Sequence, residues 1–454
     1  MAAPADKWLR VAALKPARQA PPRTVHRAPD DSDVLAKVLG AEFARNRYGE
    51  HLAIRRWFST PESCEPTPEA LELLLPRDTR PSEAQRVRGG ALADPSQWLF
   101  LDTETTGLAG GTGTYAFLIG IAWGDSGGLQ VEQFFMRDFT EEHSLLHELS
   151  ARLAERPVLI TFNGKSFDWP LLETRFTLTR AIKPPRLSAH LDLLHPARAL
   201  WKLRLGSVRL VELERSVLDA PRLGWHRDND IDSAMIPQSY FDFLRGGPAE
   251  PLAAVAHHNR MDLRGLAALL GRITALLADG EPRVESSEEA LDLFGLSRFF
   301  HRRGNSGRAR SACERALGAG LPGEFRPMAS RDLALLAKRD GDFACAAALW
   351  EQLAADPNDG IQACEQLAIH YEHRTRDLAR ALEYAQFALA KLRRLRRSPS
   401  SPLSATRAAR LEAQLTRRLA RLERRLNIQQ SALQKRLIDS LPSSRSGHRP
   451  QHSS

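Results

Sequence analysis

Cysteine is scarce in this chain of 454 residues, which has only four: Cys64, Cys313, Cys345 and Cys364. No two of them show the C-x2-C spacing that is typical of zinc sites and redox-active pairs. They are also too widely separated to indicate the disulfide framework of a small secreted domain. This cysteine usage fits a reducing compartment, and we therefore expect a cytoplasmic protein.

Long apolar runs are also missing. No stretch of about 18 apolar residues occurs, so the sequence predicts no membrane-spanning helix and no membrane partner. The first thirty residues mix Arg, Ala, Pro and Asp without the apolar segment of a secretory signal. A mitochondrial presequence is compatible with this composition, although Asp6 and the prolines disfavour it.

Acidic residues are rare only near the C-terminus. The formal net charge is +9, and residues 391–450 hold 16 Lys and Arg against 3 Asp and Glu. The rest of the chain is therefore slightly acidic. A basic segment favours a polyanionic partner such as nucleic acid, but it predicts no catalytic chemistry.

The chain is organised around the stretch WLFLDTETTG, from Trp98 to Gly107. Its first four residues are apolar and predict a strand that is buried on both faces. Asp102 and Glu104 follow, and side chains two residues apart on a strand point to the same side. Two such carboxylates repel each other unless a cation lies between them, and hard oxygen ligands suit Mg²⁺ or Mn²⁺. Taken alone, the stretch is equally compatible with a solvated acidic turn.

Two further segments carry polar residues next to predicted elements. Residues 158–172 are typical of a buried strand followed by a helix that bears Asp168. Farther along, an apolar-periodic helix carries His257 and His258 near its start and Asp262 one turn later.

These three segments together resemble the DEDD exonucleases of the RNase H-like superfamily. The family's sequence blocks D-x-E, N-x3-F-D and H-x4-D occur here in the family's order, beginning at Asp102, Asn163 and His257. The chain resembles the YprB-type branch in particular, in which an RNase H-like exonuclease domain precedes tetratricopeptide (TPR) repeats. This resemblance covers residues 97–272 well and the following repeats more loosely.

The expected fold is an α/β RNase H-like (DEDD exonuclease) domain followed by an all-α, TPR-like helical repeat domain. Apolar runs at 115–123 and 129–135, separated by the hairpin signal GDSGG, predict antiparallel pairing with the first strand. The strand at 158–162 should pair parallel to the first one. Leucine spacing predicts a helix over 141–155.

Composition divides the chain into five regions. They are a disordered or linker region with short helices at 1–95, the RNase H-like domain at 96–275, TPR-like repeats at 286–397, a basic amphipathic helix at 402–441 and a disordered tail at 442–454. Within the first region, the segment IRRWF (54–58) predicts a short strand or a packing arm. Pro322 and Pro357 are 35 residues apart, close to the TPR period of about 34. If residues 286–397 are TPR-like repeats, we expect them to bind a protein partner. The alternative is that these residues form a plain helical bundle.

The resemblance implies a two-metal-ion 3′→5′ exonuclease with two Mg²⁺ or Mn²⁺ ions. The predicted metal ligands are Asp102, Glu104, Asp168 and Asp262. The general base is His257, which has the spacing of the DEDDh group, or His258, which lies one helical turn before Asp262. The predicted substrate contacts are Thr103, Thr106, Gly107, Asn163 and Lys165, although Asn163 could equally stabilise its loop.

Other polar residues have simpler interpretations. We interpret Asp192 as a helix cap or arginine partner rather than a fifth ligand, and Asp228, Asp230 and Asp232 as a solvated loop. The basic helix could cap the repeats, pair with a partner helix or lie along phosphates, and we favour a cap that also contacts nucleic acid. The arginines expected to make those contacts are Arg417, Arg418, Arg421, Arg424 and Arg425.

The expected partner is nucleic acid, and the sequence does not distinguish DNA from RNA. The alternative function is a non-catalytic nucleic-acid-binding or protein-interaction scaffold that retains the fold.

Overall fold

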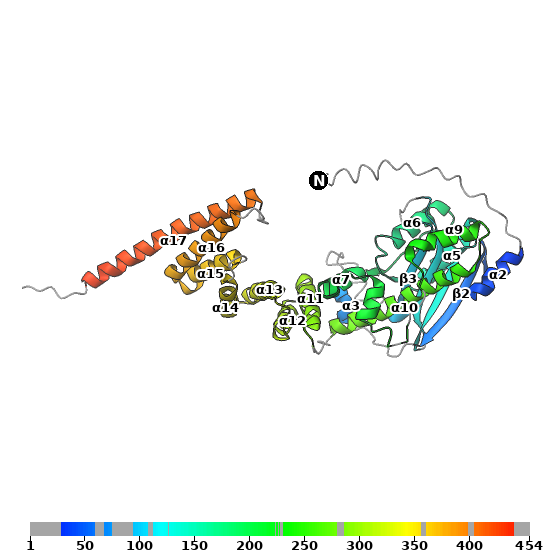
Figure 1. Ribbon diagram of the computed structural model, residues 1–454, viewed down its shortest axis with the longest axis horizontal. Helices are drawn as coiled ribbons and strands as arrows, with labels where there is room; N and C mark the ends of the chain where they lie inside the picture. Colours follow the sequence, from blue (N-terminus) through cyan, green and yellow to red (C-terminus); the bar gives the residue numbers. More distant parts are fainter. Residues whose placement is uncertain are drawn as a thin grey trace, which may run out of the picture. The chain divides into compact units, whose positions relative to one another are not determined.

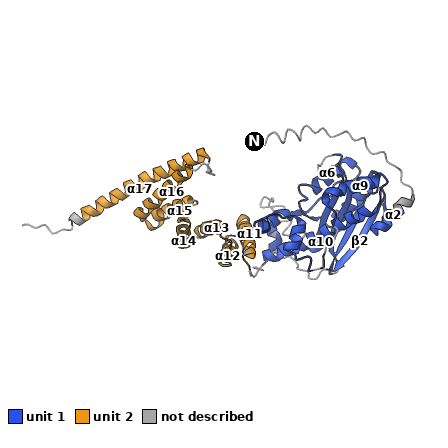
Figure 2. Ribbon diagram, viewed as in Figure 1, with its two compact units in different colours: residues 1–282 blue, residues 283–454 orange. Residues whose placement is uncertain are grey.

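The structure is a computed structural model. It describes residues 29–59, 68–74, 94–107, 112–125, 127–222, 224–225, 227, 230–278, 286–355, 360–397 and 404–439. The predictions for the N-terminal 28 residues, Cys64, Asp228 and the tail at 442–454 lie outside these residues. The chain forms two compact units, residues 1–282 and 283–454, which are coloured separately in Figure 2.

The first unit is built on one seven-stranded sheet with the strand order β1-β2-β5-β4-β3-β6-β7. The strands are β1 (Glu42–Asn46), β2 (Gly49–Ser59), β3 (Trp98–Thr105), β4 (Ala116–Asp125), β5 (Gly128–Phe135), β6 (Val158–Thr161) and β7 (Ala189–Asp192). β3, β4 and β5 form the predicted antiparallel meander, and β6 pairs parallel to β3. The predicted RNase H-like strand arrangement is thereby confirmed.

The interpretation of residues 1–95 as a linker with short helices is wrong for residues 42–59. These residues form the hairpin of β1 and β2, and β2 pairs antiparallel with β5, which extends the sheet at that edge. Leu52, Ala53 and Ile54 of β2 are buried in the main hydrophobic core. The prediction of a short strand at IRRWF is therefore confirmed, because these residues belong to β2 of the sheet.

Helices cover both faces of this sheet (Figure 1). They are α2 (Pro29–Leu39), α3 (Pro68–Leu74), α5 (Glu142–Glu155), α6 (Asp168–Thr179), α7 (Leu194–Leu205), α8 (Leu210–Ser216), α9 (Ile236–Leu244) and α10 (Glu250–Ala278), with 3₁₀ turns η1 (Pro95–Gln97), η2 (Phe139–Glu141) and η3 (Ser233–Met235).

α5 and α10 lie on opposite faces of the sheet. Arg55 of β2 is opposite Glu132 of β5, and Arg152 of α5 binds the Glu132 carboxylate at 2.9 Å. The next β5 residue, Gln133, binds Asn259 of α10 at 2.7 Å. Because successive side chains of a strand alternate between faces, the two helices cannot share one.

The second unit is helical. Its helices are α11 (Ser287–Arg303), α12 (Ser306–Gly318), α13 (Arg326–Arg339), α14 (Phe343–Ala354), α15 (Ile361–His370), α16 (Leu378–Arg396) and α17 (Ala405–Asp439), with a π-helical turn η4 (Tyr371–Thr375). Consecutive helices pack as pairs, α11 with α12, α13 with α14, and α15 with α16. Side-chain caps fix several starts: Ser286 and Glu289 form a capping box on α11, and Asp377 caps α16.

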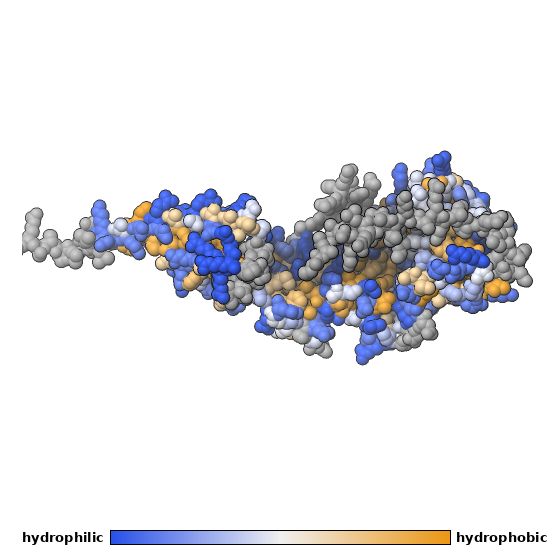
Figure 3. Space-filling model, turned by 45° about the horizontal axis from the view of Figure 1, so that its top comes forward, coloured by the Kyte–Doolittle hydropathy of each residue, from blue (hydrophilic) through white to orange (hydrophobic). Residues whose placement is uncertain are grey.

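α17 packs on α16 through an apolar stripe. Leu415 and Leu422 of α17 are buried, with at most 1% of either side chain exposed. The buried carboxylate of Glu372 in η4 binds three α17 guanidinium groups, those of Arg418, Arg421 and Arg425. On the face drawn in Figure 3, strongly hydrophilic and hydrophobic residues alternate over this unit. These three arginines therefore tie α17 to the repeats as a cap does, and their contact with phosphates stays a prediction.

Candidate active site

The site begins at the end of β3. Asp102 is opposite Gly120 and Glu104 is opposite Leu118 in the β3–β4 pair, so both carboxylates point to the α10 face. Asn259 Nδ2 donates hydrogen bonds to Asp102 Oδ2 at 2.8 Å and to the Asp102 carbonyl oxygen at 3.2 Å. An α10 side chain thus fixes the first predicted ligand.

The carboxylates at this strand end destabilise one another's charge. Loss of hydration raises the pKa of Asp102 well above its ordinary value, and the charges of Asp262, Glu104 and Asp168 raise it further. The pKa of Glu104 is also raised well above its ordinary value, by loss of hydration and then by Asp262 and Asp168. All four predicted ligands therefore belong to one electrostatic cluster, which we call the carboxylate cluster.

Asp168 is the first residue of α6, the helix that follows β6, and it belongs to the same cluster. Its Oδ1 accepts a hydrogen bond from Thr103 Oγ1 at 2.5 Å. Loss of hydration raises the pKa of Asp168, while the bond from Thr103 lowers it. The hydroxyl of Thr103, predicted to contact substrate, thus orients a predicted metal ligand.

The loop before α6 is held by Asp192. Its carboxylate accepts the backbone N–H groups of Asn163 at 2.8 Å and Lys165 at 3.1 Å, and that of Leu194 at 3.1 Å in the first turn of α7. Asp192 is therefore a loop and helix cap rather than a fifth ligand. Asn163 has a φ of 69°, the left-handed conformation that asparagine tolerates.

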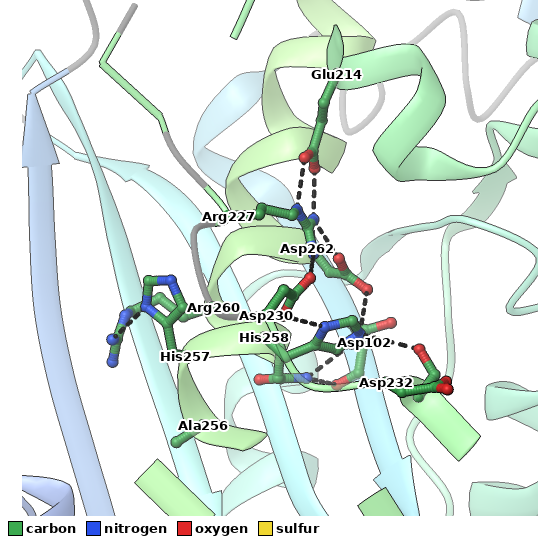
Figure 4. A network of polar contacts seen from close by, with 12 residues as sticks. Asp102, Glu214, Arg227, Asp230, Asp232, Ala256, His257, His258, Arg260 and Asp262 are labelled. Atoms are coloured by element: carbon green, nitrogen blue, oxygen red, sulfur yellow. Dashed lines mark hydrogen bonds and ion pairs between the residues drawn. The ribbon is translucent and has the colours of Figure 1, made fainter. Parts of the chain in front are cut away.

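α10 supplies Asp262 and His258 from neighbouring turns of one face. His258 Nε2 lies 3.6 Å from Asp262 Oδ2, and His258 Nδ1 lies 2.7 Å from Asp230 Oδ1 (Figure 4). Asp230 is thus no solvated loop residue, and that interpretation is wrong. Asp232 caps the η3 turn by accepting the N–H of Ala234 at 3.0 Å.

His257 points away from the carboxylate cluster, toward Arg260 (Figure 4). Its Nδ1 lies 3.2 Å from a guanidinium nitrogen of Arg260, which can only donate, so this ring nitrogen accepts. Burial and the charge of Arg260 lower the pKa of His257. His257 therefore lies away from Asp262, whereas the other candidate base, His258, lies beside it.

Arg227 is the main residue that the sequence does not reveal. Its guanidinium binds both oxygens of Glu214, at 2.6 and 2.7 Å, Asp230 at 3.1 Å, and the Oδ1 of Asp262. Only 10% of its side chain is exposed. One predicted metal ligand is therefore already paired with a cation.

Glycines allow two of these approaches. A Cβ on Gly265 of α10 would lie 2.1 Å from Glu214 Oε1, so only glycine leaves room for that carboxylate. Gly120 of β4 makes room for Asn259 in the same way. No periodic signal could have revealed Asn259, Arg227 or Glu214, because their roles depend on contacts between distant segments.

The remaining predicted substrate contacts surround the end of β3 and the α6 loop. Thr106 pairs with Tyr115 through its backbone and through its hydroxyl, which accepts the Tyr115 N–H at 3.0 Å. The Gly107 carbonyl accepts the Thr105 hydroxyl at 3.0 Å. Lys165 is exposed, so its ammonium group is accessible to a ligand.

The four carboxylates are oxygen ligands of the kind that a divalent cation prefers, but their present positions do not form a coordination site. Among the residues that the structure describes, no group of three or more His, Cys, Asp or Glu side chains is arranged to hold a metal ion as it stands. Within the same residues, no side chain donates a hydrogen bond to the Glu104 carboxylate. A partly buried anion without a donor, next to three others, is a site that a cation would stabilise.

Comparisons with known proteins identify the family to which the chain is related. Residues 99–274 match the family model described as RNase_H superfamily. The chain is 32% identical over 296 residues to the uncharacterized protein YprB of Bacillus subtilis, which covers 64% of this chain and 68% of YprB. In the described part of the chain, no helix has the length and apolar character needed to cross a membrane.

Proposed function

The chain belongs to the RNase H superfamily, and from this premise we propose that it is a metal-dependent nuclease, a 3′→5′ exonuclease of the DEDD type acting on DNA or RNA. The observation that carries the proposal is the carboxylate cluster, in which the charges of Asp262 and Asp168 raise the pKa of both Asp102 and Glu104. A fold gains no stability from four crowded anions, whereas phosphodiester hydrolysis needs them.

Asp102, Glu104, Asp168 and Asp262 would hold two Mg²⁺ or Mn²⁺ ions, and such ions stabilise charge on the attacking and departing oxygens. Asp102 is oriented by Asn259, and Asp168 by Thr103. The protein thus holds two of the ligands in place through neutral hydrogen-bond donors.

His258 is the proposed general base. Its Nδ1 faces Asp230, so Nε2 is directed toward Asp262, 3.5 Å from the Ser233 hydroxyl, and its lone pair could take a proton from water. An imidazole has a suitable basicity for this role. His257 is not proposed as the base because its ring faces Arg260.

The helical unit is proposed to be a TPR-like platform for a protein partner. α13 and α15 begin 35 residues apart, which is close to the TPR period of about 34. The three cysteines that the structure describes there are free thiols, which supports a cytoplasmic location.

The test is a cleavage assay on the full-length protein. End-labelled single- and double-stranded DNA and RNA would be incubated with Mn²⁺, with Mg²⁺ and with EDTA. We expect metal-dependent release of mononucleotides from the 3′ end, and its loss in Asp102→Asn and Asp168→Asn. Glu173→Gln, an exposed carboxylate on the same helix as Asp168, should retain activity. Binding without cleavage under every metal condition would favour the non-catalytic alternative.

A further inference from the structure

A second polar cluster lies on α10, next to the stripe that carries His258 and Asp262. Arg260 follows His257 by three residues, and Arg264 follows Arg260 by four. This spacing places the three side chains on one stripe of the helix. In Figure 4 the side chains of His257 and Arg260 point away from the carboxylate cluster. The two stripes give one helix an anionic side and a cationic side.

The β1–β2 hairpin faces the cationic stripe. Ile54 of β2 is opposite Gln133, which binds α10, so the alternate residues Arg56 and Phe58 point to the α10 side as well. The Arg264 guanidinium lies over the Phe58 ring, 4.3 Å from its centroid. The hairpin and the helix therefore form one surface, which we call the α10–β2 patch.

The arginines of this patch have no carboxylate partner among the described residues. Arg56 donates to the carbonyl oxygens of Gly40 and Arg55, and Arg260 donates to His257. The hydrogen bond of the Arg264 guanidinium to another described residue goes to the sulfur of Met261, at 3.7 Å. Three other arginines of the unit, Arg137, Arg152 and Arg227, are instead ion-paired.

The cations also repel one another. Loss of hydration lowers the pKa of Arg260, and the charges of Arg56 and Arg264 lower it further. Loss of hydration lowers the pKa of Arg264 as well. The charge of Glu214 acts on Arg264 in the opposite sense, but neither Arg56 nor Arg260 has a carboxylate partner among the described residues. An anionic ligand would therefore offset the repulsion at Arg260.

Aromatic rings accompany these charges. Arg264 lies between Phe58 and Trp225, with its guanidinium 4.6 Å from the Trp225 ring centroid. Cations interleaved with aromatic rings are the combination that binds single-stranded nucleic acids, because phosphates meet the charges and unpaired bases meet the rings. A duplex hides its base faces and would use only the charges.

We infer that the α10–β2 patch, formed by Arg56, Arg260 and Arg264 with Phe58 and Trp225, binds the backbone of a single-stranded nucleic acid. The inference rests on the proposed function in one respect, since the bound strand would be the one that reaches the carboxylate cluster on the adjacent stripe of α10. The hairpin that supplies Arg56 and Phe58 extends the sheet beyond β5 and is thus an integral part of the binding surface.

The experiment measures binding without cleavage. Fluorescence anisotropy in EDTA would follow a labelled 12-nucleotide dT or U strand on the full-length protein and on Arg56→Gln, Arg260→Gln and the double variant. We expect the Kd of the double variant to rise roughly tenfold. The slope of log K against log salt should become shallower by about 0.7 for each phosphate that a variant no longer binds.

Arg272→Gln is the matched control, because Arg272 is an exposed arginine on the same helix outside the patch. It should bind as the wild type does. Circular dichroism checks that each variant is folded. If Arg260→Gln does not fold, the affinity and salt slope of Arg56→Gln, a variant at an exposed position, test the inference. Unchanged affinity and salt slope in folded Arg56→Gln would overturn the inference, as would a wild type that binds polyglutamate but neither strand.

The two proposals fail in different ways. A wild type that binds through the patch but cleaves nothing with Mn²⁺ would refute the nuclease and support the patch. If the wild type cleaves, and the patch variants keep the wild-type affinity and the wild-type dependence of affinity on salt, the proposed binding role of the patch is refuted and the nuclease proposal stands.

Discussion

The side-chain amide of Asn259 fills the space that a methyl group on Gly120 would need, since an ideal Cβ at Gly120 lies 2.0 Å from Asn259 Oδ1. Asn259 is fully buried and also binds Gln133 and Asp102. A β4 residue without a side chain therefore determines where a β3 carboxylate is held. The first prediction follows from this contact.

Gly120→Ala should displace Asn259 and release Asp102. We expect a decrease of about 1–3 kcal/mol in unfolding free energy from overpacking, together with at least tenfold slower cleavage. Denaturant melts and the cleavage assay measure both. Gly124→Ala, on the same strand with no atom within 4 Å of its new Cβ, is the control. Wild-type behaviour of Gly120→Ala would show that Asn259 does not position Asp102.

Replacing His258 by Ala should slow cleavage roughly 10²–10⁴-fold, because the proposed base is removed. His257→Ala should reduce the rate far less, since His257 contacts Arg260 rather than the carboxylate cluster. Single-turnover rates at saturating substrate separate this effect from binding. The reverse ranking of the two variants would restore His257 as the base.

Glu104→Gln should stabilise the metal-free protein. The substitution removes a charge that loss of hydration and the carboxylates of Asp262 and Asp168 disfavour, and it breaks no side-chain hydrogen bond among the described residues. We expect a higher Tm for the first unit in EDTA at pH 8, and a smaller gain on adding Mn²⁺ than in the wild type. Glu173→Gln should change neither quantity. A lower Tm of Glu104→Gln than of the wild type in EDTA would contradict the claim that repulsion within the carboxylate cluster destabilises the metal-free protein.

His190 should make the first unit sensitive to acid. Burial, and then the charge of Lys165, lower its pKa from 6.5 to about 4, and its Nε2 pairs with Thr161 Oγ1 at 2.9 Å. The unfolded chain therefore binds a proton near pH 6.5 that the folded protein does not bind until about pH 4. The contribution of His190 to stability is complete above pH 6.5 and decreases as the pH falls toward 4.

This decrease should amount to about 2–3 kcal/mol over that range. His190→Gln should flatten the dependence of unfolding free energy on pH between 6.5 and 4, whereas His195→Gln, at an exposed position of α7, should leave it unchanged. An equal slope in both variants would assign the acid sensitivity to other groups.

Glu372→Gln should loosen α17 from the helical unit. The buried carboxylate holds three guanidinium groups that the variant would leave with a weaker acceptor. We expect the unfolding free energy of this unit to fall by about 1–2 kcal/mol and protease cleavage within α17 to accelerate. Arg417→Gln, at an exposed position that makes no contact with Glu372, is the control. Unchanged protection of α17 would show that its leucine stripe alone holds it.

Local periodicity predicts the elements that long apolar runs define. The strand of Trp98–Leu101 and the strand at 158–162 are evident from the sequence because buried strands need continuous apolar residues. Of the β1–β2 hairpin only the IRRWF part of β2 is suggested by the sequence, because the hairpin is stabilised by pairing with β5, about 75 residues away, and its arginines hide the apolar alternation. Such pairing leaves no local signature.

The site divides in the same way. The three sequence blocks locate the carboxylates, but spacing cannot choose between His257 and His258, which differ by only one residue on a helix. The geometry separates them because a rotation of about 100° directs one ring to Asp262 and the other to Arg260. Asp230 and Arg227 cannot be recognised in a polar loop, since their partners are on α8 and α10.

The bond between Arg227 and Asp262 makes metal binding and the rearrangement of a loop a single equilibrium. Any divalent ion that coordinated Asp262 would have to compete with a guanidinium that also binds Glu214 and Asp230, so the free energy of that ion pair is subtracted from the intrinsic affinity. By reciprocity, whatever draws Arg227 away, a phosphate included, would tighten metal binding by the same factor. Asp230 would be released in the same event, and with it the orientation of His258. An ion pair that looks purely structural would then link the arrival of substrate to the completion of the metal site.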